Sequence, residues 1–134
     1  MWDTYDGRQR IGSVLSGATA LGFILMAALH ATGFDAVSAE AEQAPEMLRL
    51  FAPTLWLAYA LALALLGLIA GIVAFRPDPP GRFVLACVAL FPLGSAGLQV
   101  AFIGLIPHTL ILVAVGVLAV VTAVVLPGQD PYEG

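Results

Sequence analysis

Residues 104–112, with the sequence GLIPHTLIL, interrupt the longest charge-free run of the chain and decide how many helices that run forms. The run extends from Phe83 to Gln129. It is long enough for two membrane spans, because a bilayer core takes about 20 helical residues. Gly104 can end one helix and Pro107 can begin the next, since glycine suits a helix C-terminus and proline suits a first turn. The stretch therefore predicts two antiparallel neighbouring helices joined by a tight turn.

Two further charge-free stretches, Ile11–Phe34 and Leu50–Phe75, each fit one span. Only 10% of the residues are charged and the mean hydropathy is +0.98, whereas about a quarter of the residues of a soluble domain are charged. We therefore predict an all-α fold, a four-helix transmembrane bundle with up-down topology that forms one membrane domain over residues 1–134. The predicted spans lie near 11–33, 51–75, 83–104 and 107–126, with an outer loop at 34–50 and a cytoplasmic turn at 76–82.

The arginines predict the orientation of the bundle. Arg8, Arg10, Arg76 and Arg82 fall on one side of a four-span arrangement, and Arg49 alone falls on the other. The positive-inside rule then places both termini in the cytoplasm and makes the chain a multi-pass protein of the cell membrane.

The two polar connections differ in what they are expected to form. Residues 34–49 are rich in alanine and glutamate, which suits a short surface helix, and Pro45 restarts the chain toward the second span. The turn at 76–82, RPDPPGR, contains three prolines and is not expected to be helical.

Composition and spacing exclude several classes of function. No Asp, Glu, Lys or Arg lies inside a predicted span, and proton- or sodium-coupled transport usually needs such a group. Small multidrug exporters have a membrane-embedded glutamate, four-helix quinone-linked disulfide enzymes have cysteine pairs, and membrane glutathione transferases have charged residues in their spans. This chain has none of these groups, and its one cysteine, Cys87, is expected to be a small buried apolar residue. A basic patch for nucleic acid is also missing.

Neutral polar residues gather toward the outer ends of the predicted helices. The candidate binding residues are His30, Tyr59, Gln99 and His108, one from each span. In an up-down bundle the helices that carry His30 and His108 are neighbours. Ser16, Thr19, Phe23 and His30 also share a stripe on the first helix, so that face is expected to look inward.

Three interpretations of this polar group stay open. The histidines can lie at the membrane interface, where Trp56 and Tyr59 belong to the aromatic belt. They can instead line a pocket for a lipid or quinone, with histidine and glutamine as hydrogen-bond partners. Finally, His30 and His108 can supply both axial ligands of a b-type haem.

Small residues spaced four apart predict how the helices pack, because they let backbones approach closely in lipid. Most of these pairs, including Gly97 and Ala101, are expected to lie inside the bundle, whereas Gly67 and Gly71 can serve a homodimer. No G-x-S-x-G, HExxH or phosphate-loop motif is present, which disfavours an enzyme. The sequence thus favours a non-catalytic accessory or assembly subunit that packs against other membrane subunits or itself within the lipid bilayer. The alternative is a ligand-binding or electron-transfer protein that uses His30 and His108 to bind haem b, quinone or lipid.

Overall fold

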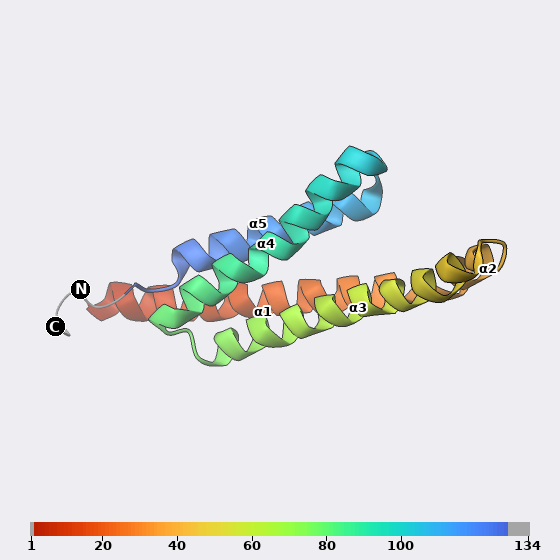
Figure 1. Cartoon of the computed structure of the whole chain (residues 1–134). Helices are drawn as coiled ribbons and strands as arrows, with labels where there is room; N and C mark the ends of the chain where they lie inside the picture. Colours follow the sequence, from red (N-terminus) through yellow and green to blue (C-terminus); the bar gives the residue numbers. More distant parts are fainter. Residues whose placement is uncertain (1, 129–134) are drawn as a thin grey trace.

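The computed structural model describes residues 2–128, with side chains from Tyr5 onward, and within this range the chain forms five helices and no strand (Figure 1). The helices are α1 (Trp2–Thr32), α2 (Phe34–Glu42), α3 (Glu46–Phe75), α4 (Pro79–Phe102) and α5 (Pro107–Val125). Four membrane-length apolar segments are present: α1 together with α2, then α3, α4 and α5. The predicted all-helical class and the four candidate spans are thereby confirmed.

The helices form two antiparallel hairpins. In the long hairpin, α2 follows α1 after Gly33 and α3 returns along α1; in the short hairpin, α4 and α5 pack against each other (Figure 1). Contacts between α1 and α5 join the two hairpins, whereas α3 and α4 barely touch. We call the end where α1 begins and α5 ends the terminal end, and the end with α2 and the α4–α5 turn the loop end. The hairpins lie together at the terminal end and diverge toward the loop end (Figure 1).

Three of the four spanning helices begin earlier than hydropathy predicts, and α5 begins at Pro107 as predicted. α1 extends back to Trp2, α3 to Glu46 and α4 to Pro79, whereas their C-terminal ends lie within two residues of the predicted ones. Hydropathy marks only the apolar core of a span, and a helix can continue beyond it into water. The expectation that residues 76–82 are not helical holds for 76–78 and is wrong for 79–82, because Pro79 and Pro80 occupy the first turn of α4, where no N–H is needed. The short surface helix expected after residue 34 is present as α2.

The turn between α4 and α5 has the predicted form. Gly104 has φ = 101°, in the left-handed region that favours glycine, and its N–H donates to the carbonyl oxygen of Gln99 at 2.9 Å. Pro107 is the first residue of α5. Local stereochemistry at these two residues therefore makes two helices out of one apolar run.

Close helix contacts depend on two glycines. A Cβ built on Gly116 would lie 2.7 Å from Cγ of Leu93 and 3.3 Å from Cγ of Pro92, so α5 approaches α4 closely only without a side chain there. A Cβ on Gly67 would lie 2.9 Å from Cδ1 of Ile24, so this glycine packs between α3 and α1 of one chain. The homodimer predicted through Gly67 and Gly71 stays a prediction, and the buried face of Gly67 is already occupied.

At the terminal end, arginine side chains from α1 and α4 bind the last carbonyl groups of α5. Arg8 of α1 donates to the carbonyl oxygens of Val124 and Val125, each at 3.2 Å, and Arg82 of α4 donates to that of Ala123, also at 3.2 Å. The last carbonyls of a helix have no partner inside it and carry its partial negative charge, so these arginines cap α5.

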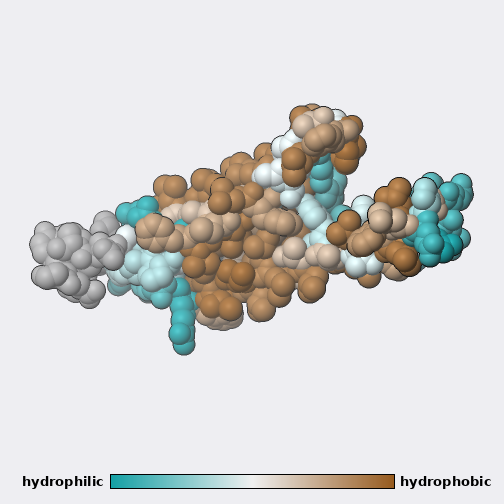
Figure 2. All heavy atoms as spheres, in the orientation of Figure 1, coloured by the Kyte–Doolittle hydropathy of each residue, from teal (hydrophilic) through white to brown (hydrophobic). Residues whose placement is uncertain are grey.

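The outer surface of the bundle is an apolar belt with hydrophilic ends (Figure 2). Its exposed side chains include Leu21, Leu25, Leu61, Leu65, Leu90, Leu98, Val117 and Val121. Two expectations about α4 are corrected here. Cys87 is exposed rather than buried, and Gly97 and Ala101 face outward, away from the bundle interior. An apolar helix in lipid shows no polar face, so its sequence does not reveal which side packs.

Candidate functional site

His30 and His108 meet where the two hairpins diverge. Their ring centroids lie 5.6 Å apart, with the rings tilted by 43°. His30 comes from the last turn of α1 and His108 is the second residue of α5. The contact between α1 and α5 thus brings together two of the four predicted site residues.

Aromatic rings from α3 and α4 complete this site, which we call the histidine cluster: His30, Trp56, Tyr59, Phe91 and His108. Trp56 stacks on His30 with a centroid distance of 3.9 Å and an interplanar angle of 18°. Tyr59 lies 4.7 Å from His30 on the same helix face as Trp56, and Phe91 lies 5.3 Å from Tyr59. The cluster therefore takes rings from all four long helices.

A hydrogen bond fixes the tryptophan in place. The indole N–H of Trp56 donates to the backbone carbonyl oxygen of His30 at 2.7 Å. A Cβ built on Gly33 would lie 2.7 Å from Trp56 Cζ2, so the indole also packs against the backbone after α1. Trp56 is thus bound to the bundle rather than free in a membrane belt, and it holds the His30 ring from one face.

Three polar atoms of the cluster are buried without a hydrogen-bond partner among the described residues: Nε2 of His30, Nε2 of His108 and the Tyr59 hydroxyl. His30 itself is only 8% exposed. A buried polar group without a partner costs about 1 to 3 kcal/mol, and native proteins satisfy most such groups. The three atoms come from three helices, so the cluster presents hydrogen-bonding capacity that the fold does not use.

Apolar side chains separate the cluster from the polar residues of the terminal half. The expected inward stripe of α1 is confirmed, since Ser16, Thr19 and Phe23 are fully buried and His30 is nearly so. Thr19 pairs with Thr122 of α5 at 3.3 Å, about 16 Å along α1 from His30 at 1.5 Å per residue. Phe23 and Met26 lie between them and are almost completely buried. The cluster is therefore a site at one end of the bundle, with an apolar core beneath it.

The remaining predicted site residue, Gln99, has a different partner. Thr109 Oγ1 donates to Gln99 Oε1 at 2.8 Å, which links α4 to α5 beside the cluster. Ser95, one turn earlier on α4, lies close to the Tyr59 hydroxyl. Gln99 and Ser95 thus border the cluster, and the Gln99 oxygen is engaged by Thr109.

A notch lies between the two hairpins at the loop end, the end of the bundle that also holds the cluster. Figure 2 shows hydrophilic atoms in a notch between the projecting end of the short hairpin and the longer arm formed by α2 and the start of α3. Trp56, Tyr59 and His108 are partly exposed, in contrast to His30. The notch lies beside the apolar belt (Figure 2).

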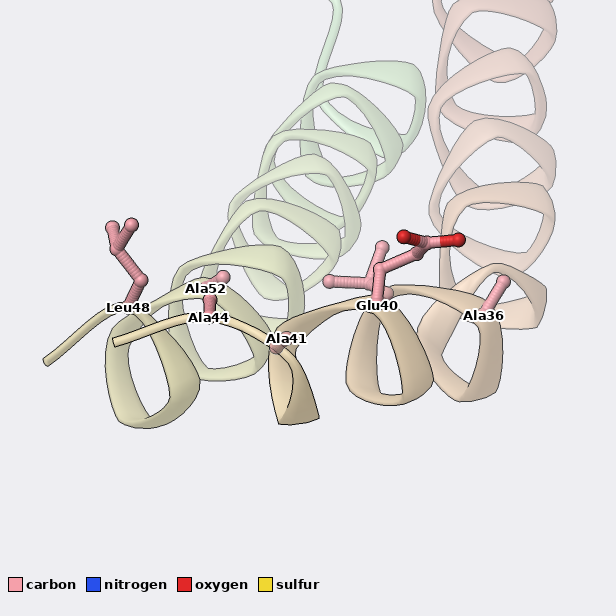
Figure 3. A pocket seen from close by; sticks show the side chains of 7 residues that line it. Ala36, Glu40, Ala41, Ala44, Leu48 and Ala52 are labelled. Carbon is pink, nitrogen blue, oxygen red and sulfur yellow. The ribbon is translucent and has the colours of Figure 1, made fainter. Parts of the chain in front are cut away.

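A second hollow lies farther along the long hairpin, between α2 and the start of α3 (Figure 3). Its lining is mainly alanine, together with Val37, Glu40 and Leu48. The Glu40 carboxylate is the one charged group there (Figure 3). Without converging polar groups this shallow groove offers little to fix a ligand in one orientation.

The described residues contain no group of three or more His, Cys, Asp or Glu side chains placed to hold a metal ion. The indole N–H of Trp56 is already bonded, so the polar groups that the cluster can offer to a ligand are two imidazoles and one phenol. Sequence reasoning missed Phe91 and the structural role of Trp56. Trp56 and Tyr59 are three residues apart and so share one helix face, and this spacing could have predicted that both rings pack against His30.

Similarity to known proteins gives no indication of function, so the functional argument rests on the geometry of the histidine cluster. No protein-family model, no curated protein and no solved structure matches the chain.

Proposed function

We propose that this chain is a multi-pass protein of the cell membrane that binds a small molecule from the bilayer at the histidine cluster. Four membrane-length apolar helices support the location. The orientation follows from the arginines: Arg8, Arg10, Arg76 and Arg82 gather at the terminal end, which therefore faces the cytoplasm. The cluster then lies in the outer half of the membrane.

The observation that carries this proposal is the group of unpaired polar atoms on three helices. Nε2 of His30 and Nε2 of His108 are buried without a hydrogen-bond partner among the described residues, and the buried Tyr59 hydroxyl has only Ser95 of α4 beside it. Lipid offers few hydrogen bonds to replace those lost from water, so such atoms are costly unless a ligand engages them. These atoms are buried, so a ligand that enters between the hairpins reaches them only when the rings that cover them turn.

Haem fits the cluster less well than a small hydrogen-bonding molecule does. One face of the His30 ring is already covered by Trp56 at 3.9 Å, and Tyr59 lies 4.7 Å from the same ring. A macrocycle needs open space beside its axial imidazoles, and arginine often pairs with its propionates. Arg49, the arginine of the loop end, is exposed on α3.

An accessory subunit is the second candidate, and the outward face of α4 favours it. Gly94 and Gly97 are exposed and have no atom within 4 Å of an added Cβ. Glycines on a lipid-facing surface allow another helix to approach closely. This function would depend on the glycines of α4 rather than on the histidine cluster.

Native mass spectrometry of the protein released from its host membrane tests ligand binding. We expect the wild type to retain a small molecule whose mass is absent from His30→Phe, a change that keeps a ring but removes the nitrogens. Thr54→Ala is the matched control, because Thr54 is exposed on α3 near the cluster and its hydroxyl bonds to its own helix at Leu50.

Three results would count against the proposal. Retention of the same mass by His30→Phe would remove the cluster from the binding site. A co-purifying membrane protein without a small molecule would favour the accessory subunit. A haem absorption band that disappears in the histidine variants would assign the cluster to electron transfer instead.

A further inference from the structure

The charge around the cluster restricts the ligand that the proposed function requires. The charged residues of the loop end are all exposed: Asp35, Glu40, Glu42, Glu46 and Arg49. None belongs to the cluster, whose polar groups are two imidazoles and a phenol. An ionised phosphate or ammonium group would be desolvated there without a counter-charge, which is costly. The site therefore suits a neutral headgroup.

The hydrogen-bonding inventory restricts the ligand further. A neutral imidazole has one donor and one acceptor nitrogen, and a phenol can donate or accept. His30, His108 and Tyr59 can thus donate to carbonyl oxygens and, in the other tautomer or rotamer, accept from hydroxyl groups. A headgroup that interconverts between carbonyl and hydroxyl forms would find partners in both forms.

The shape of the cluster favours a flat ring. His30 is stacked on Trp56. The Tyr59 ring lies 4.7 Å from the His30 ring, and the Phe91 ring lies 5.3 Å from the Tyr59 ring, so the four rings form an aromatic wall. Aromatic side chains pack well against planar rings in stacked or edge-to-face arrangements. The apolar belt beside the notch suits an attached hydrocarbon tail.

From these features, and on the premise that the cluster binds a ligand at all, we propose that its ligand is a membrane quinone or quinol. The quinone ring lies in the notch against the aromatic wall, and its oxygens pair with the free nitrogens and hydroxyl of His30, His108 and Tyr59. The isoprenoid or alkyl tail leaves between the hairpins into the bilayer. The proposal concerns binding and assigns no electron transfer.

Quenching of Trp56 fluorescence by decylubiquinone tests this directly, because Trp56 touches the site and the chain has only two tryptophans. In a Trp2→Phe background, we expect saturable quenching of Trp56 in nanodiscs. In His108→Phe and Tyr59→Phe, the apparent dissociation constant should rise about tenfold, the effect of losing one hydrogen bond. Testing two variants on different helices guards against one of them failing to fold.

A matched reporter separates binding from collisions in the bilayer. Leu57 is exposed beside Trp56, so Leu57→Trp in a chain with Trp2→Phe and Trp56→Phe should show only linear, non-saturating quenching. Linear quenching of Trp56 itself would overturn the quinone assignment. If Trp56 quenching is linear but mass spectrometry still shows a molecule that depends on His30, the ligand class is wrong and ligand binding stands. If both signals are absent, both proposals fail.

Discussion

Gly116 of α5 packs against Leu93 and Pro92 of α4, and it shows how a single position can limit helix spacing. A methyl group there would lie 2.7 Å from Leu93 Cγ and 3.3 Å from the rigid ring of Pro92. We expect Gly116→Ala to lower the free energy of unfolding by about 1 to 3 kcal/mol, the usual cost of overpacking. Thermal or denaturant unfolding in detergent measures the change.

Gly94→Ala is the matched control for this change. Gly94 lies within α4 and nothing is within 4 Å of its added Cβ. Alanine is a better helix former than glycine by up to about 1 kcal/mol, so this variant should be neutral or more stable. Equal destabilisation of both variants would mean that the α4–α5 contact does not depend on Gly116.

At the scale of helices, the end of α5 depends on arginines from two other helices. Arg8 and Arg82 donate to the carbonyl oxygens of residues 123–125, which α5 itself leaves unpaired. Each of Arg8→Gln and Arg82→Gln should lower the free energy of unfolding by about 0.5 to 1 kcal/mol, and less at high salt. Unfolding of the purified variants at two salt concentrations checks this.

Arg10→Gln shows whether charge alone explains the effect. Arg10 is exposed on α1, two residues after Arg8, and donates no hydrogen bond to the described residues. Its replacement removes the same charge and should leave stability nearly unchanged. A loss equal to that of Arg8→Gln would show that the capping of α5 contributes nothing specific.

At the scale of the whole molecule, the proposed orientation places α2 outside the cell and the α3–α4 turn in the cytoplasm. In a Cys87→Ser background, Glu42→Cys should react with a membrane-impermeant maleimide in intact cells. Asp78→Cys should react only after the membrane is opened. Both positions are exposed, so reactivity depends on the side of the membrane. The opposite labelling pattern would reverse the topology and place the histidine cluster in the cytoplasmic half.

The divergence of the two hairpins is the feature of the whole molecule on which the proposed function rests. The hairpins join through α1 and α5 and diverge toward the loop end (Figure 1), and rings from all four long helices meet where they diverge. The hydropathy pattern and the order of the predicted spans indicated that the two histidines lie at the same end of the bundle and on neighbouring helices. It did not reveal that Trp56 stacks on His30 or that Thr109 engages Gln99.

Local sequence features predict the four apolar segments, the turn at Gly104 and Pro107, the surface helix after residue 34 and the inward stripe of α1. Each of these follows from local properties: hydropathy over one span, the backbone preferences of glycine and proline, and helical periodicity. Helix packing, by contrast, turns Cys87 and Gly97 outward and brings His30, Trp56 and His108 together. The physical reason is that lipid is as apolar as the bundle core. The packed and exposed sides of a span therefore look alike in sequence, and only helix–helix contacts distinguish them.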